Sequence, residues 1–323
     1  MSTERAAAEP GDPVPAADPL SRRLTRVVVG MTLLVIVAGA NVTTTKSGDA
    51  IPTWPWGWFT SDVPTAIEMS HRFVAGLLVV ATILLAVAAR RTHSGALARI
   101  AWIAFGIVIL QAVLGGVRVL LGAENEQHTL LPLFKVVHAT LGQLFFLLAV
   151  AAAAMTSDWW SSTKQRPLDD AGLALLRGGG LALAFLVLQL VLGALGRHDV
   201  LVPREVHAVF ALVPMILCAR LVLVSSSEVP RDVELFRGPS AALGFVTALQ
   251  LALGIASYIV TSDQPDPLQR DISGVVTING HVGASAVMMG IVVSMILRAV
   301  RLWGVPTDER VAEARRLQDD AAR

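Results

Sequence analysis

The stretch AIEMSHRF, residues 66–73, stands where a polar segment gives way to a long apolar run. Glu68 and His71 are three residues apart, so on a helix they share a face. Charged and titratable side chains at membrane depth are costly, which makes this pair a candidate functional site. Two plainer interpretations remain open. The pair could simply mark where a helix leaves the membrane, or Glu68 could pair with Arg72 or stabilise the helix start.

The composition is that of an all-α polytopic membrane protein. Hydrophobic residues make up 54% of the chain and charged residues only 16%, against about 45–50% and about 25% in soluble domains. The apolar residues gather in runs of about 20, the length that spans a bilayer core. The net charge of +1 gives no reason to expect a nucleic-acid partner. The eight expected transmembrane runs lie near 24–43, 67–89, 98–120, 131–154, 174–196, 205–224, 239–261 and 275–298.

A short pattern recurs along the chain. Gln-x-x-Leu-Gly stands at 111–115, 189–193 and 250–254, and the first run carries a weaker version from Val35 to Gly39. After each glycine the chain leaves the membrane, and soon after it re-enters there is one histidine. Recurrence of this kind predicts four helix pairs, arranged as two pseudosymmetric four-helix bundles. The four histidines are His71, His138, His207 and His281.

Lysine and arginine predict how the chain is oriented. They gather before the first run and after runs two, four, six and eight, whereas the other loops are richer in acids. Both termini are therefore expected in the cytoplasm. Residues 1–22 lack the apolar core of a signal peptide and are expected to form a disordered tail. The expected sequence of units is the tail 1–22, a bundle at 23–155, a cytoplasmic linker at 156–173, a bundle at 174–302 and a tail at 303–323.

The spacing of the histidines favours haem. All four would lie on helices that run inward, and therefore at one depth near the outer leaflet. His71 would face His138, and His207 would face His281, so each pair could hold a haem iron from both faces. The glycines would leave room for the porphyrin and for close helix approach. A single histidine could instead be a hydrogen-bonded helix contact, and zinc lacks a nearby Cys, Asp or Glu to complete a tetrahedral set.

The two halves differ three residues before their first histidine. Glu68 stands there in the first half, and Arg204 stands there in the second. A carboxylate beside a cofactor can move protons or stabilise positive charge, whereas a guanidinium suits a haem propionate. Arg118 and Lys135 are further candidates for propionate binding. The histidines outside the pattern, which are expected to be solvated, are His93, His128 and His198.

Together these residues resemble the haem A synthase family, membrane enzymes that mature haem for terminal oxidases. The resemblance rests on Glu68-Met-Ser-His71-Arg72, on the later repeat histidines, and on the first outer loop. In that loop Thr45-Lys-Ser47-Gly48 precedes Pro52-Thr-Trp54-Pro55. The resemblance covers roughly residues 22–300. It implies eight transmembrane helices and an oxidoreductase that oxidises the ring methyl of haem O, through successive hydroxylations, to the formyl group of haem A.

The resemblance also implies a cofactor, partners and a location. Glu68 matches the family's acidic residue implicated in catalysis, and Arg72 and Arg204 are expected to bind the cofactors. The expected partners are the lipid bilayer, haem O, haem O synthase and terminal-oxidase assembly factors, in a bacterial plasma membrane. The iron ligands implied are His71 and His138 for haem O or haem A, and His207 and His281 for haem b.

One departure from the family pattern concerns cysteine. Many bacterial members carry a cysteine pair in the first outer loop, but here Ile51 precedes Pro52. The single cysteine, Cys218, lies in an apolar run. The chain is therefore expected to belong to a cysteine-free branch of the family, to use another electron route, or to do a related but different job. Two other classes satisfy part of the pattern: a non-enzymatic bis-histidine dihaem electron carrier of the cytochrome b561-like kind, and a transporter with a duplicated fold.

Overall fold

The computed structural model describes residues 16–55, 57, 62–92, 95–124, 129–230, 232–312 and 316. Within these residues the chain is helical and contains no strand. The short elements are α5 (Asp158–Ser162) and three 3-10 helices, η1 (Ser47–Asp49), η2 (Glu234–Phe236) and η3 (Pro267–Gln269). The long helices are α1 (Pro19–Thr44), α2 (Val63–Thr92), α3 (Ala96–Glu124), α4 (Leu131–Met155), α6 (Asp170–Arg197), α7 (Arg204–Phe210) continued by α8 (Leu212–Ser227), α9 (Arg237–Asp263) and α10 (Ile272–Trp303).

These helices make eight spans that are long and apolar enough to cross a membrane. Each predicted apolar run lies within one span, so the predicted fold class is confirmed: the chain is an all-helical, multi-pass membrane protein. The pseudosymmetry of the two halves and the cytoplasmic position of both termini stay predictions. They depend on sequence arguments that the helix arrangement does not test.

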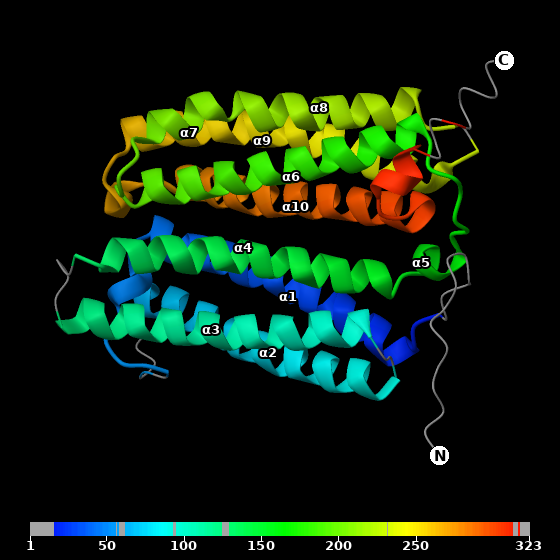
Figure 1. The fold of residues 1–323 in the computed structure, drawn as a ribbon. Helices are drawn as coiled ribbons and strands as arrows, with labels where there is room; N and C mark the ends of the chain where they lie inside the picture. Colours follow the sequence, from blue (N-terminus) through cyan, green and yellow to red (C-terminus); the bar gives the residue numbers. More distant parts are fainter. Residues whose placement is uncertain are drawn as a thin grey trace.

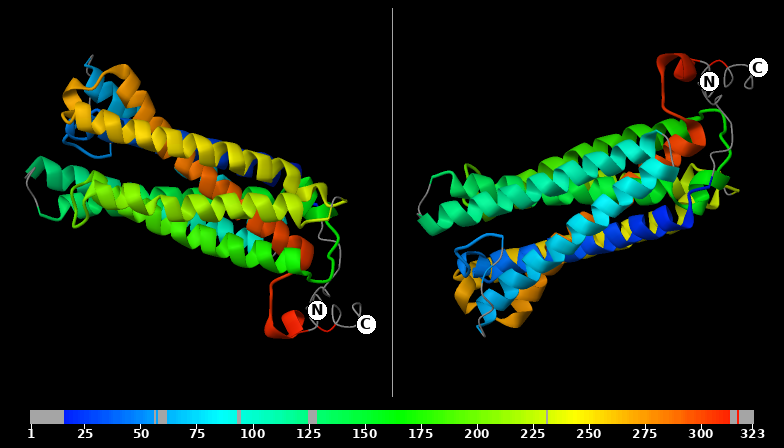
Figure 2. Two further views of the ribbon diagram at one scale, coloured as in Figure 1. Left: turned by 90° about the horizontal axis from the view of Figure 1, so that it is seen from above. Right: turned by 90° about the horizontal axis from the view of Figure 1, so that it is seen from below.

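The spans form two groups, α1–α4 and α6–α10, which lie one above the other in Figure 1. In the first group α1 packs on α2 and α4, and α3 packs on the same two helices. In the second group α6 and α9 each pack on both α8 and α10. The groups meet where α10 packs against α1 and α4, and where α4 contacts α6. Seen from two further sides, the spans run side by side along the length of the molecule (Figure 2).

Each group has its own buried apolar core. The first core includes Val28, Leu85 and Phe145, all at most 2% exposed. The second is larger and includes Leu243 and Trp303, which are equally buried. Because lipid is as apolar as these side chains, close packing rather than transfer from water holds such helices together.

Two boundaries differ from the expected ones, and each has a local cause. The tail predicted at 1–22 ends earlier, because α1 begins at Pro19 and the Asp18 carboxylate accepts a hydrogen bond from the Ser21 N–H at 3.0 Å. The linker predicted at 156–173 contains α5 and the start of α6. There the Asp169 carboxylate accepts from the Gly172 N–H at 2.7 Å. Aspartates of this kind cap the exposed N–H groups of a first helical turn.

The sixth run was expected to be one helix, but it is interrupted at Ala211 between α7 and α8. Pro214 explains the interruption. A proline has no N–H for the carbonyl four residues earlier, here that of Phe210, and its ring clashes with that carbonyl. The regular helix therefore ends at Phe210 and resumes at Leu212.

A polar network joins the two groups near one end of the spans. The Asn279 amide donates to Oδ1 of Asn41 at 3.0 Å, and the Thr44 hydroxyl lies 2.9 Å from Oδ1 of Asn279. Arg197 donates to the same hydroxyl at 2.6 Å, and Arg270 donates to the Thr44 carbonyl at 3.3 Å. Polar groups at membrane depth need such partners, because lipid offers none. We call this end, where α1 ends and α4 begins, the histidine end.

The first prediction tests this network. Asn279→Leu removes two buried hydrogen bonds between α10 and α1, and it should lower the free energy of unfolding by about 1–2 kcal/mol. The measurement is thermal or denaturant unfolding of the purified protein in detergent. Thr277→Ala is the control, since its hydroxyl bonds only within α10, to the Ser273 carbonyl. Equal stability of the two variants would show that the network does not hold the groups together.

Candidate functional site

Each repeat histidine packs its ring against the repeat glycine of the preceding span. A Cβ placed on any of these glycines would lie closer to the imidazole than ordinary van der Waals contact. The distances from such a Cβ to the imidazole Cε1 are 2.9 Å for Gly39 and His71, 3.3 Å for Gly115 and His138, 2.7 Å for Gly193 and His207, and 3.1 Å for Gly254 and His281. The glycines were expected to leave room for a porphyrin and for close helix approach. In the structure each one receives an imidazole of the next span, and room for a porphyrin stays a prediction.

The residue four positions before the glycine also faces the ring. Nδ1 of His207 lies 3.1 Å from the backbone carbonyl of Gln189. Because a carbonyl can only accept, this contact requires the proton on Nδ1. Nε2 is then the nitrogen that carries the lone pair, the tautomer usual for a metal-ligating histidine, and in this structure that lone pair faces an amide donor. Nε2 lies 3.4 Å from the amide nitrogen of Gln189.

His207 and His281, the repeat histidines of the second group, face each other. The ring centroids of His207 and His281 are 6.3 Å apart, with the rings at 88° to each other. Imidazole nitrogens bind metals at about 2 Å, so two rings on opposite sides of one iron would have centroids roughly 6 Å apart. In the first group His71 and His138 pack against Gly39 and Gly115 in the same way, and their pairing stays a prediction. Within the described residues, no cluster of three or more His, Cys, Asp or Glu could hold a metal by itself.

Buried polar atoms that make no hydrogen bond within the described residues gather around these pairs. Such atoms are rare in proteins, and each one requires an explanation. One such atom, Nε1 of Trp303, lies at the end of the spans away from the histidines. Those that lie near the pairs include Oε1 of Gln111, Gln189 and Gln250 and the hydroxyls of Thr140 and Ser257. Paired imidazoles amid such groups fit a haem in each helix group. Iron ligation by them stays a prediction.

Glu68 is buried and directed to the loop that follows α1. Its Oε1 lies 2.6 Å from a guanidinium nitrogen of Arg72, and its Oε2 accepts from the Ile51 N–H at 3.0 Å. The pairing with Arg72, raised from the sequence as the plainer alternative, is therefore present. It does not decide whether Glu68 also acts in catalysis, which stays a prediction.

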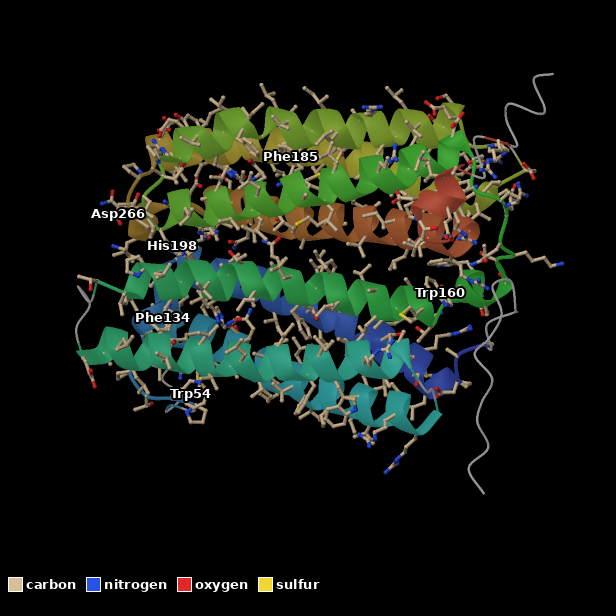
Figure 3. All side chains as sticks on the ribbon, in the orientation of Figure 1. Trp54, Phe134, Trp160, Phe185, His198 and Asp266 are labelled. Carbon is tan, nitrogen blue, oxygen red and sulfur yellow. The ribbon has the colours of Figure 1, made fainter. Side chains whose placement is uncertain are left out.

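Arg72 and its neighbours fasten this loop over α2 and α3. The Arg72 guanidinium donates to the carbonyls of Thr53 and Ile51, at 2.6 and 3.0 Å. Arg118, on α3, donates to the carbonyl of Gly48. The indole of Trp54 lies against Gly116 of α3, as its position beside that helix in Figure 3 shows. Arg72 was predicted to bind a cofactor; its observed partners are the loop and Glu68, and its role toward haem stays a prediction.

Arg204 lies across the end of α9. It donates to the Thr261 carbonyl at 3.2 Å and stacks over the Tyr258 ring, 5.1 Å from the centroid. Its Nε lies 3.3 Å from Glu205, and its side chain is 44% exposed. The guanidinium is thus at the histidine end beside α9. Its predicted contact with a propionate is not tested by these contacts.

Arg197, a cation between the two helix groups, was missed from the sequence. Arg197 donates to Ala40 and Thr44 of α1. His198 lies between α4 and α6 (Figure 3), and it is half-buried rather than solvated as expected. Burial, together with the charges of Arg197, Lys135 and Arg118, lowers the pKa of His198 to about 3, so it stays neutral. The sequence pattern could have identified Arg197, because it follows Gly193 by four residues, much as the already named Arg118 follows Gly115 by three. His93 and His128 lie outside the described residues.

The fold and these pairs define a helical membrane protein with facing imidazoles at one end of its spans. Residues 59–202 match the model of the COX15-CtaA family, described as cytochrome oxidase assembly protein. This match supports assignment of the chain to the haem A synthase family, as the resemblance predicted. The matched region includes His71 and His138, whereas His207 and His281 lie beyond it. No curated protein matches the chain.

The second prediction uses glycines of one helix. A Cβ at Gly193 would lie 2.7 Å from His207, so Gly193→Ala must displace the imidazole or separate α6 from α7. We expect a loss of about 1–3 kcal/mol in unfolding free energy and a lower haem content. Thermal unfolding and the pyridine haemochrome assay would measure the two effects.

The matched control is Gly180→Ala on the same helix, where a new Cβ meets nothing within 4 Å. This variant should be neutral or more stable by up to about 1 kcal/mol, because alanine favours helix. Gly39→Ala and Gly30→Ala form the same comparison on α1, with His71 as the affected ring. If the variants next to histidines behave like their controls, the close contact has no structural importance.

Proposed function

We propose that this protein is a haem A synthase, which oxidises the ring methyl of haem O to the formyl group of haem A for terminal oxidases. The observation that carries the proposal is the facing pair His207 and His281, with ring centroids 6.3 Å apart, in a chain whose four repeat histidines all contact repeat glycines. The family match, to a cytochrome oxidase assembly protein, supports the same biochemical setting.

The proposed sites divide between the helix groups. His71 and His138 hold haem O and then haem A as substrate and product, while His207 and His281 hold a resident haem b. Haem iron supplies one-electron redox chemistry when it is bound. The protein's part is to orient the rings, which it does by packing each imidazole against a helix backbone that lacks a side chain.

Glu68 is the proposed catalytic residue of the first site. It stands one helical turn before His71, so the two side chains share a face of α2. A buried carboxylate can accept or release a proton at Oε1 or Oε2. Arg72 and the Ile51 N–H now occupy those atoms. Proton transfer at Oε1 therefore requires the ion pair with Arg72 to open, so Arg72 would regulate the proton affinity of Glu68.

Cations near the pairs are the proposed anchors for haem propionates, and Arg72 and Arg204 are the principal candidates. Guanidinium groups suit carboxylates because they can donate two parallel hydrogen bonds. The distribution of lysine and arginine places the histidine end, and with it both haem sites, toward the outer leaflet of a bacterial plasma membrane. Haem O synthase and oxidase assembly factors are the proposed protein partners.

The electron route does not use a thiol of the first outer loop, because that loop contains no cysteine. Cys218 is the one cysteine of the chain, and it is buried in α8 of the second group. In the loop itself, the Ile51 N–H bonds to Glu68, so the backbone rather than a side chain connects the loop to the proposed catalytic carboxylate.

A bis-histidine electron carrier is the second candidate, since paired imidazoles suit it equally well. The position of the pairs favours the enzyme. A carrier that moves electrons across a membrane needs haems at both depths, whereas the four Gly–His contacts all lie toward the histidine end of their spans. An enzyme would need a proton-transferring group such as the buried Glu68 beside His71, whereas a simple electron carrier would not.

Co-expression with a haem O source tests the proposal. Haem extracted from the purified protein should contain haem A alongside haem b, as resolved by chromatography. Two haem populations with low-spin spectra should be present. Extraction of unchanged haem O from folded protein supplied with reductant and oxygen would exclude the synthase function. Reversible reduction of haem b in both sites, without product, would favour the carrier.

The third prediction concerns Glu68. Glu68→Gln keeps the size and one hydrogen-bond acceptor but cannot take up a proton as a carboxylate does. Conversion of haem O should fall about a hundredfold or more, while haem content stays close to that of the unsubstituted protein. Glu124→Gln is the control, because Glu124 is an exposed residue at the end of α3. Normal conversion by Glu68→Gln would remove Glu68 from the catalytic role.

A further inference from the structure

In each helix group a glutamine clamps one histidine through its backbone. The Gln111 side-chain amide, on α3, donates to the carbonyl of His138 on α4 at 2.9 Å. The Gln189 amide, on α6, donates to the carbonyl of His207 on α7 at the same distance. Both glutamines stand four residues before the repeat glycine that contacts the same histidine. The glutamine thus ties the backbone of the histidine, and the glycine receives its imidazole, from the same facing helix.

The packing around His138 is adapted to this clamp. A Cβ at Gly142, one turn after His138, would lie 3.2 Å from the Gln111 amide nitrogen. A larger side chain there would push the amide away from the carbonyl. The bond is also partly buried, where water competes little and a hydrogen bond restrains geometry more than it does at a surface.

The first helix pair lacks the clamp. Val35 stands where Gln111 and Gln189 stand in their own repeats, and valine has no amide to donate. The start of α2, which carries His71, is tied instead to the loop after α1, through Glu68 and Arg72. His71 is therefore positioned by a loop attachment, whereas His138 is positioned by a bond from within the membrane-spanning helices.

We infer that Gln111 and Gln189 are positioning residues, which hold His138 and His207 in place. In the first pair, His71 is then the imidazole that can move away from the iron. The inference rests on the proposed function, because it concerns ligands of haem iron. His71 and His138 would together hold the haem iron of the first site. A small molecule would then reach that iron only if one imidazole withdrew, and the imidazole whose backbone lacks an amide clamp would withdraw more readily.

Carbon monoxide is a suitable probe, because it binds ferrous haem only at a vacated axial position. The experiment uses the full-length protein purified with haem bound and measures the apparent CO affinity by optical difference spectra. Val35→Gln supplies the missing amide to His71 and should weaken CO binding about three- to tenfold, the factor of one hydrogen bond. Gln111→Val removes the clamp on His138 and should strengthen CO binding by a similar factor.

Gln143→Val is the matched control. Gln143 is a buried glutamine of α4, five residues beyond His138, and its amide oxygen accepts from Ser285 of α10. This variant should change CO affinity less than about twofold. If Val35→Gln leaves CO affinity unchanged, His71 is not the ring that moves away. If Gln111→Val resembles Gln143→Val, Gln111 does not position His138.

Hydrogen exchange on haem-free protein tests the clamp without any cofactor. Gln111→Val should speed exchange about three- to tenfold in the segment around His138, and Gln189→Val should do so only around His207. Unchanged exchange in both segments would overturn the positioning role. Protein that binds no haem but shows these exchange changes would refute the proposed function and leave the clamps intact. Normal haem A formation by the protein, together with unchanged hydrogen exchange in the two variants, would refute only this inference.

Discussion

An imidazole can face a neighbouring helix at close range only where that helix presents bare backbone. This steric constraint recurs at Gly39, Gly115, Gly193 and Gly254, each against one histidine of the next span. It sets how closely the two helices of a pair approach each other and which of their residues lie at the same depth along the spans. The pairs of imidazoles, and with them the proposed haem sites, follow from those four contacts.

The polar groups of the spans are arranged around the same end. Asn41, Asn279 and Thr44 join the two groups there, and Glu68 and Arg72 fasten the loop that follows α1. Lipid cannot satisfy hydrogen bonds, so a membrane protein must concentrate its polar side chains where they can serve one another. The buried atoms left without partners in the described residues lie mainly beside the imidazoles, where a bound cofactor would meet them.

Much of the fold could be predicted because apolar length and periodicity are local properties. All eight runs lie within spans, and the interruption at Ala211 has a local cause in Pro214 that could have been recognised. The ion pair of Glu68 with Arg72 was also foreseeable, since side chains four apart on a helix are neighbours. The polar contacts between distant segments, such as Arg197 with Thr44, could not be foreseen. They depend on how each helix is rotated about its axis.

The sequence by itself therefore determined the class of protein, the number of spans and the histidines that recur at matching positions, because each follows from composition or spacing. Only the tertiary structure decided that each repeat glycine receives an imidazole, that Gln111 reaches the carbonyl of His138, and that Ile51 bonds to Glu68. These contacts join residues far apart in the chain. Their geometry is set by helix packing, on which a pattern of residue types carries no information.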